Sequence, residues 1–352
     1  MFYVDGHQDL AYGALALGRD FRRPVEETRR REAGTSVPDV GGTCTLGFPE
    51  MRSAGIGLVF ATVFTLPAAQ QKKGEPAYYS PEGAHEQALA QLDLYNRWIA
   101  EDEYLHAVHT QGDLARLQAL RDDPSRDGRD IGIVILMENA EPVSEPSELE
   151  MWWKRGVRII GPAWARNRYT GSTLDGDGLT PKGYELLEAM AEFGMVLDLT
   201  HSSDRACEQS LDAYRGQVVV THANSRALCN TGRMIPDHII SDLFARDGLF
   251  GLMPANWALG KPDSSGDRRS EVVMDDVVNA VEHLRALGAD HLVALGSDWD
   301  GGFGREQLPV CFDSIADIGA IAEGLRNGGA PAEFIDGFMG GNWLRFLKSN
   351  LP

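Results

Sequence analysis

The sequence predicts an α/β fold, namely a closed (β/α)8 barrel of the TIM type. Short apolar segments recur along the chain, amphipathic helical segments separate them, and eight apolar segments can be counted. Strands that alternate with helices form parallel βαβ units, and eight such units favour a closed barrel over an open sheet. We expect residues 1–352 to form one domain, because barrels of this type often reach such lengths.

The expected strands are the short apolar segments that are bounded by polar residues or glycine. They are residues 1–4, 57–65, 131–137, 157–161, 195–200, 217–221, 248–253 and 291–296. Functional residues of such barrels lie at the C-terminal ends of the strands, so the residues that follow these segments are the main candidates for the functional site.

Three segments between the strands have clear helical signals. Residues 84–99 and 275–287 repeat apolar side chains at three-to-four spacing, and Gly288 suits the end of the second helix. For a helix over 182–193, Thr180 is a suitable N-cap and Pro181 a suitable first residue.

Two polar stretches are expected to be long loops. Residues 66–83 follow a strand and therefore lie on the face where such barrels keep their sites. Residues 260–269 are a candidate rim or lid.

Composition narrows the possible partners. The net charge of −19 argues against binding to nucleic acid or to an anionic membrane surface. We see no signal peptide and no run of about 18 apolar residues, so the expected location is cytoplasmic. The cysteines lie far apart and are expected to be reduced and packed rather than reactive: Cys44, Cys207, Cys229 and Cys311.

The first candidate site residues are His7 and Asp9. Side chains two residues apart on a strand point the same way, so these two should converge at the end of the opening strand. Nitrogen and oxygen donors of this kind suit a divalent cation such as zinc. The alternative is an ordinary surface histidine and aspartate, because so short a pattern is weak by itself.

Polar residues also follow four other expected strands. They are Glu138, His201, His222 and Asp298, after the third, fifth, sixth and eighth strands. Each has a structural alternative, as a hydrogen-bonded rim residue or as a cap of the following helix. In a barrel, however, these ends share one cavity, where the crowded side chains would repel one another unless cations compensate. Two divalent ions would do so. The other histidines are expected to be structural or exposed: His85, His106, His109, His238, His283 and His291.

These residues stand in segments that resemble the membrane (renal) dipeptidase family, the binuclear zinc dipeptidases of peptidase family M19, which have amidohydrolase-like barrels. D-G-H-Q-D-L at 5–10 resembles D-G-H-N-D-L, and M-E-N at 137–139 resembles V-E-G. Segments 194–201, 221–227 and 296–301 are similar to G-M-x-x-D-L-S-H, S-H-S-x-A-R-A and G-[SA]-D-[FY]-D-G. Segments 179–183, 233–237 and 341–345 also match family patterns, so the resemblance covers nearly the whole chain.

The resemblance implies a site for two divalent metal ions, with Zn²⁺ the first expectation. His7 and Asp9 would hold one ion, His201 and His222 the other, and Glu138 would bridge them. Two ions that share a water can lower its pKa from about 16 toward about 7, which gives a hydroxide nucleophile. These donors also accept Mn, Co or Fe, so metal identity stays open.

The resemblance also assigns the remaining chemistry. Asp298 would move a proton from the water to the leaving amine. Arg233 would pair with the terminal carboxylate of the substrate, because its planar fork suits two oxygens. From the residues alone, Arg233 is an ordinary surface arginine near a helix start.

One departure from the family concerns substrate binding. The family has a histidine in L-T-x-T-H-x-x-N that contacts the substrate carbonyl oxygen, and alignment on Asn167 puts Trp164 at that position. The resemblance therefore implies that Trp164 and Asn167, together with Arg233, bind the substrate. An indole N–H donates one hydrogen bond but cannot accept a proton. Loss of an oxyanion donor commonly lowers the rate by about 10² to 10³. Arg166 or Arg168 are candidate replacements, and Asn139 stands where the family has glycine.

We therefore expect a metal-dependent dipeptidase, and the resemblance extends this to dipeptides with a D-residue on the C-terminal side of the bond. The first alternative is an amidohydrolase that acts on a non-peptide amide, lactam or N-acyl amino acid, as Trp164 suggests. The second is an inactive barrel that binds metal. A homodimer is common in this family, although no patch in the sequence identifies an interface.

Overall fold

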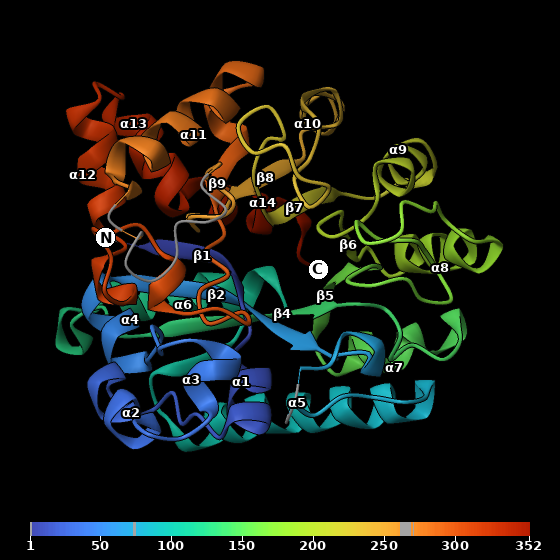
Figure 1. Ribbon diagram of the computed structural model, residues 1–352, viewed down its shortest axis with the longest axis horizontal. Coiled ribbons are helices and arrows are strands. Elements are labelled where there is room, and N and C mark those ends of the chain that lie inside the picture. The colour runs from blue at the N-terminus through green and yellow to red at the C-terminus, as the bar shows by residue number, and fades with distance from the viewer. Residues whose placement is uncertain (1, 73–74, 261–268, 270) are drawn as a thin grey trace.

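The barrel is the centre of the molecule, and helices surround it (Figure 1). This computed structural model describes residues 2–72, 75–260, 269 and 271–352. Its sheet has nine strands, of which eight follow one another in the order β1-β2-β4-β5-β6-β7-β8-β9 with parallel pairing throughout. The predicted (β/α)8 fold is confirmed.

Each predicted strand overlaps one strand of the barrel. Their bounds are β1 (Tyr3–Gln8), β2 (Ile56–Phe64), β4 (Ile131–Glu138), β5 (Val157–Gly161), β6 (Val196–Asp198), β7 (Val218–Ala223), β8 (Leu249–Leu252) and β9 (Val293–Leu295). β1 is longer than predicted, so His7 lies inside the strand rather than after it. β6 is shorter than predicted, and His201 follows it after a two-residue gap.

The ninth strand, β3 (Leu105–Ala107), has no counterpart in the prediction. It pairs with the first residues of β4, from Ile131 to Ile133, whereas β5 pairs with the later residues of the same strand. A three-residue strand is too short to show a period in the sequence.

The seam between β1 and β9 is closed by a buried carboxylate. Asp5 in β1 accepts hydrogen bonds from the backbone N–H of Ser297 at 2.7 Å and from its hydroxyl at 2.5 Å. The backbone N–H of Asp298 donates to the carbonyl of His7 at 3.2 Å. These bonds fix the loop after β9 against β1 and thereby place Asp298 beside His7.

The helices lie outside the barrel, as Figure 1 shows. Their bounds are α1 (Leu10–Leu17), α2 (Val25–Glu32), α3 (Val37–Gly41), α4 (Phe48–Ala54), α5 (Pro81–Glu101), α6 (Gln111–Asp122), α7 (Leu149–Lys154), α8 (Pro181–Glu192), α9 (Asp204–Ala213), α10 (Asp237–Phe244), α11 (Met274–Leu287), α12 (Ala320–Asn327), α13 (Ala332–Asp336) and α14 (Asn342–Asn350). The three predicted helices correspond to α5, α8 and α11. As predicted, the Thr180 hydroxyl caps α8 by accepting from the N–H of Gly183.

The two predicted loops are residues 66–83 and 260–269, and most of the first lies within the described part of the chain. Tyr78 makes backbone hydrogen bonds with Leu66 and Ala68, which folds the first loop back onto itself, and residues 73–74 lie outside the described residues. Of the second loop, residues 261–268 lie outside the described residues, so the rim or lid prediction stays a prediction.

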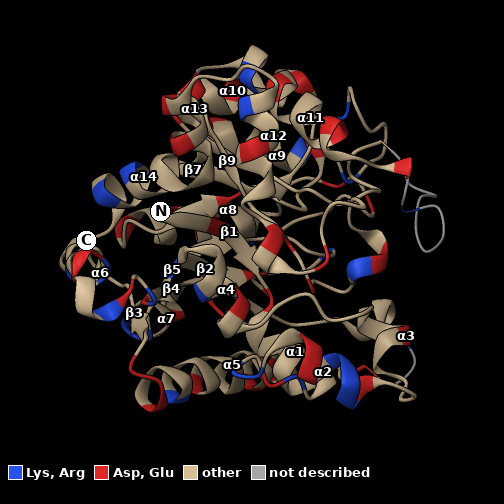
Figure 2. Cartoon of the chain, turned by 90° about the vertical axis from the view of Figure 1, so that its left-hand side faces the viewer, with Lys and Arg blue, Asp and Glu red and all other residues tan. Residues whose placement is uncertain are grey.

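Surface properties follow the composition. In Figure 2, acidic and basic residues are interspersed along the outer helices. Within the described part of the chain, no helix has the length and apolar character needed to cross a membrane.

All four cysteines are free, and three of them are buried as predicted. For Cys311 the prediction of a packed side chain is wrong, because it lies exposed in the segment before α12.

Candidate metal centre

The C-terminal ends of the strands surround a cavity of about 230 Å³. Six of the residues predicted from the sequence line it: Asp9, Glu138, Trp164, His201, Arg233 and Asp298. His7 and His222 lie directly below, and both are fully buried. The structure therefore brings together at one place all the candidate donors that lie scattered along the sequence.

The backbone at the rim is unusual for these residue types. Six non-glycine residues of the described chain have positive φ, and four of them follow barrel strands at this end. Those four are Asn139 (φ 82°), His201 (φ 66°), Asp298 (φ 55°) and Asp300 (φ 63°). The left-handed region is disfavoured for residues with a Cβ, and such outliers cluster at functional sites. The turns aim the side chains of His201 and Asp298 into the cavity.

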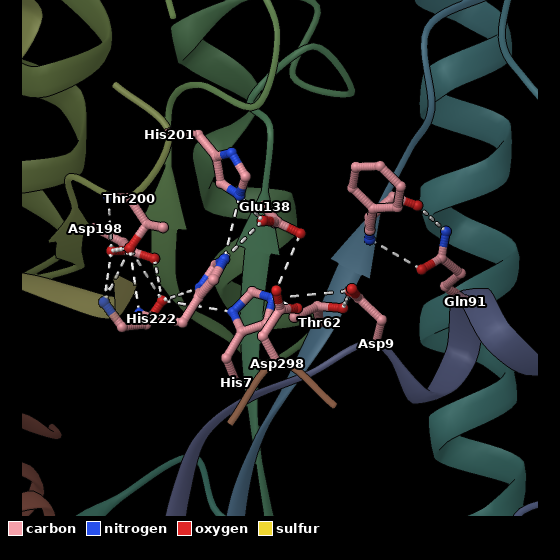
Figure 3. A network of polar contacts seen from close by, with 12 residues as sticks. His7, Asp9, Thr62, Gln91, Glu138, Asp198, Thr200, His201, His222 and Asp298 are labelled. Atoms are coloured by element: carbon pink, nitrogen blue, oxygen red, sulfur yellow. Dashed lines mark hydrogen bonds and ion pairs between the residues drawn. The ribbon is translucent and has the colours of Figure 1, made fainter. Parts of the chain in front are cut away.

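The Glu138 carboxylate occupies the centre of the site, and histidines from three other strand ends converge on it (Figure 3). Its Oε2 atom lies 3.5 Å from Nε2 of His7. Its Oε1 atom lies 2.9 Å from Nε2 of His201 and 3.6 Å from Nε2 of His222. Each oxygen therefore faces a different set of nitrogen donors.

The spacing of the donors fits metal ligation. Nε2 of His7 lies 3.9 Å from a carboxylate oxygen of Asp9 and 3.9 Å from one of Asp298. Two ligand atoms of one tetrahedral zinc ion are about 3.4 Å apart, given bonds of about 2.0 to 2.2 Å. Among the residues described, this buried nitrogen of His7 has no hydrogen-bond partner. A buried polar nitrogen without a hydrogen-bond partner is rare, and a cation bound to its lone pair would satisfy it.

The charges of the site are also unbalanced. Burial raises the pKa of Asp9 to about 6, and the charge of Glu138 adds to the shift. Burial raises the pKa of Asp298 well above its ordinary value. At His7, burial lowers the pKa, but the surrounding carboxylates, Glu138 foremost, outweigh it and raise the pKa to about 10. Three carboxylates thus surround one imidazole, and divalent ions would supply the missing positive charge.

Arg233 reaches the same cavity from the loop before α10. Its guanidinium donates to the carbonyl of His222 at 3.0 Å and lies 3.4 Å from Nε2 of His201. Its other terminal nitrogen, Nη1, is shielded from solvent and has no hydrogen-bond partner among the described residues. Because the Arg233 side chain lines the cavity, it can pair with a carboxylate that enters there.

The two other predicted substrate-binding residues are placed differently from each other. Trp164 lines the cavity, and its ring lies 5.1 Å from the ring of Phe64 and 6.0 Å from that of His201. Asn167 does not line the cavity. Its amide nitrogen donates to Pro162 and Asn139, and its amide oxygen accepts from the backbone of Tyr169 and Thr170. Asn167 therefore shapes the loop that carries Trp164.

Arg166 and Arg168 are also occupied elsewhere. Arg168 pairs with Glu141 at 3.0 Å and donates to the carbonyl of Ser144. Arg166 is exposed and pairs with Asp177. Neither lines the cavity, so neither stands in for the family histidine in this structure.

Four residues of the site have no sequence signal that identifies them. Tyr12, Lys72, Glu75 and Trp257 line the cavity from segments far apart in the chain. Gly301 also lines it, and a Cβ there would lie 2.0 Å from Oδ1 of Asp298. Only the close approach in the folded chain reveals these roles.

Other supporting residues carry a weak signal. Thr62 and Thr221 are hydroxyl residues inside apolar strands, and both hydroxyls contact candidate donors: Thr62 donates to Asp9, and Thr221 contacts His7 and His222. A polar residue inside an apolar strand predicts a buried partner, although not which one.

The whole chain matches a known family. A sequence model of the membrane dipeptidases (peptidase family M19) matches residues 1–350. Dipeptidase 3 of Mus musculus is 27% identical over 359 residues, which cover 98% of this chain and 64% of the mouse protein. Alignments with five curated relatives cover 47% to 76% of the length of those proteins.

Solved structures agree on the fold. A metallopeptidase from Rhodobacter sphaeroides, liganded with a phosphinate mimic of the dipeptide L-Ala-D-Ala, superposes with a TM-score of 0.79 at 20% identity, covering 100% of this chain and 99% of that chain. A metallopeptidase of family M19 described as dipeptidase AC gives a TM-score of 0.80 at 22% identity, with the same coverage.

Proposed function

Because this chain belongs to the membrane dipeptidase family, peptidase family M19, we propose that it is a metal-dependent dipeptidase that hydrolyses the amide bond next to a free carboxylate. The observation that carries the proposal is the Glu138 carboxylate, whose two oxygens face separate groups of donors.

We assign two divalent ions to this site, with Zn²⁺ as the first candidate. His7 and Asp9 would hold one ion, His201 and His222 the other, and Glu138 would bridge them. When bound, ions of this kind polarise a carbonyl and make water a nucleophile near neutral pH. Donor atoms of His7, Asp9 and Asp298 lie within 4.8 Å of one another, as do those of His7, Glu138 and His222. Nε2 of His201 lies 2.9 Å from Glu138, and this clustering of nitrogen and oxygen donors supports a metal site.

Other side chains of the site bind the substrate, transfer a proton and exclude water. Arg233, which lines the cavity, pairs with the terminal carboxylate of the substrate and so orients the scissile bond. Asp298 holds and moves the proton that passes to the leaving amine. Trp164 and Phe64 form an apolar wall that excludes water.

The cavity suits a small substrate. Its volume of about 230 Å³ is on the scale of a dipeptide. We include dipeptides with a D-residue on the C-terminal side. Trp164 favours a second candidate, hydrolysis of an N-acyl amino acid or a lactam, because an indole replaces the histidine that would contact a peptide carbonyl. A homodimer and a cytoplasmic location stay predictions from the sequence.

The proposal is tested by metal analysis of the purified protein together with a substrate panel. We expect about two equivalents of divalent metal and hydrolysis of dipeptides such as L-Ala-L-Ala and L-Ala-D-Ala. Preferential hydrolysis of N-acetyl-alanine or a lactam would support the second candidate. Bound metal without turnover of any of these compounds would support an inactive barrel and contradict both.

A further inference from the structure

Behind the candidate metal centre lies a second buried carboxylate, Asp198, at the end of β6. It is 1% exposed, and four donors surround it. Thr200 gives its backbone N–H at 3.0 Å and its hydroxyl at 2.7 Å. Thr221 gives its backbone N–H at 3.0 Å and its hydroxyl at 2.5 Å. Figure 3 shows Asp198 and Thr200 of this cluster beside the histidines. Acceptance from four donors is the arrangement of an ionised carboxylate.

The Thr221 hydroxyl connects this carboxylate to two imidazoles. Its oxygen lies 3.1 Å from Nδ1 of His222 and 3.4 Å from Nδ1 of His7. A hydroxyl has one proton to donate and two lone pairs that accept. The short contact to Asp198 uses the proton, so the hydroxyl can only accept from the two rings. Both rings must then carry a proton on Nδ1.

We propose that Thr221, held by Asp198, is a positioning residue that fixes the Nδ1–H tautomer of both His7 and His222. In the neutral form of each ring, which metal binding requires, Nε2 then carries the lone pair, and this is the atom that faces Glu138. One hydroxyl thereby sets the tautomer of an imidazole on each side of the Glu138 carboxylate, which couples the two halves of the site.

The backbone around Thr221 gives this hydroxyl little freedom to move. A Cβ added at Gly296 would lie 1.8 Å from the carbonyl oxygen of Thr221, and one added at Gly251 would lie 1.9 Å from it. Neighbouring strands therefore approach this residue as closely as glycine allows. The rings of His7 and His222 pack against each other with centroids 3.6 Å apart, so both reach the same hydroxyl.

The inference rests on the proposed metal site, and zinc binding to the metal-free full-length protein tests it. Thr221→Val keeps the branched shape and removes the hydroxyl, whereas Thr221→Ser keeps the hydroxyl. Loss of such a supporting partner typically weakens metal affinity by about 10- to 100-fold. We expect Thr221→Val to bind Zn²⁺ that much more weakly in a competition titration, and Thr221→Ser to stay within about threefold of wild type.

A matched control separates this role from general stability. Thr200→Val removes the other hydroxyl bond to Asp198, but the Thr200 hydroxyl contacts no ring nitrogen in the described structure. The melting temperature of the metal-free protein should be lower in both valine variants than in wild type. The affinity for Zn²⁺ should fall only in Thr221→Val. Equal affinity of Thr221→Val and wild type, or an equal loss in Thr200→Val, would overturn the inference while leaving the proposed function intact.

A measurement on the wild type does not depend on the folding of any variant. In protein labelled with ¹⁵N-histidine and loaded with Zn²⁺, NMR should show His7 and His222 both protonated on Nδ1. A proton on Nε2 of either ring would overturn the inference. Failure of the wild type to take up Zn²⁺ would instead remove the metal site itself, and the proposed function with it.

Discussion

Asp298 has a strained backbone conformation and places its carboxylate in the candidate metal centre. Its φ of 55° lies in the left-handed region, and its carboxylate lies 3.9 Å from Nε2 of His7. The loop that carries it is tied to β1 through Ser297 and Asp5. The barrel seam therefore fixes the position of this carboxylate, as the proposed proton transfer requires.

Replacement of Asp298 by asparagine tests its assigned role. Asparagine keeps the shape and tolerates the left-handed backbone, but it cannot move a proton at neutral pH. General acid–base groups contribute about 10² to 10⁴ in rate, so we expect kcat to fall by about that factor. Metal content, measured by mass spectrometry of the purified protein, should stay near that of wild type. Full activity of Asp298→Asn would show that another residue transfers the proton.

Asn139 is a departure from the family pattern, and its backbone conformation explains why asparagine can replace glycine there. Its φ of 82° accounts for the glycine that relatives have here, because glycine and asparagine tolerate this region best. Its side chain donates to the carbonyl of Thr65 and accepts from Asn167 and from the backbone N–H of Glu141. The substitution thus adds hydrogen bonds between loops without altering the donors of the metal centre.

We predict that Asn139→Gly and Asn139→Ala differ in stability in a way that reveals both effects. The glycine variant loses the side-chain hydrogen bonds, each with a net contribution of about 1 kcal/mol. The alanine variant loses the same bonds and adds left-handed strain of about 1 to 2 kcal/mol. Urea unfolding should therefore rank wild type above glycine and glycine above alanine. Equal stability of the two variants would mean that backbone strain has little effect at this position.

At the scale of elements, a buried ion pair joins the segment after α1 to the loop after β9. Arg19 lies 3.2 Å from Asp300 and 2.9 Å from Glu32 in α2. Asp300 also accepts from the backbone N–H groups of Thr45 and Leu46. Asp300 thereby fixes the segment before α4 through hydrogen bonds that span 255 and 254 residues of the chain.

Arg19→Met should destabilise the protein strongly. The substitution leaves two buried carboxylates without their cation, and such a loss typically costs about 3 to 5 kcal/mol. Lys154→Met provides the control, because Lys154 and Glu150 form an exposed pair on α7. Exposed pairs contribute less than about 1 kcal/mol. Chemical unfolding that gave similar losses for both variants would contradict the structural importance of the buried pair.

The elements also show what a sequence can and cannot predict. Apolar segments and helical periods are local signals, so the eight barrel strands and helices α5, α8 and α11 could be predicted. The candidate donors could be predicted because they lie near the C-terminal ends of strands, either within the last residues or just after them. The contact of Asp5 with Ser297 spans 292 residues, and the placement of Tyr12 and Glu75 in the cavity depends on loop paths. Neither leaves a periodic trace in the sequence, and β3 is too short to leave one.

At the scale of the whole molecule, the candidate metal centre joins parts of the barrel that are distant in the chain. His7 comes from β1, Glu138 from β4 and His222 from β7, while His201 follows β6. All of them are buried or nearly so. Cations at this point would hold opposite sides of the barrel together, and their binding free energy would add to the stability of the fold.

Metal removal should therefore lower the melting temperature of the whole domain. A ligand present at about 1,000 times its Kd stabilises the native state by about 4 kcal/mol. From an unfolding entropy of about 2.1 cal/mol/K per residue, this corresponds to a shift of roughly 5 °C for a chain of this length. Calorimetry of chelator-treated and zinc-restored protein measures it. Glu138→Gln is the control: it weakens both groups of donors at once, so its melting temperature should respond little to zinc. A wild type that melts at the same temperature with and without metal would contradict a site that spans the barrel, because ions bound between four strand ends cannot leave the stability of those strands unchanged.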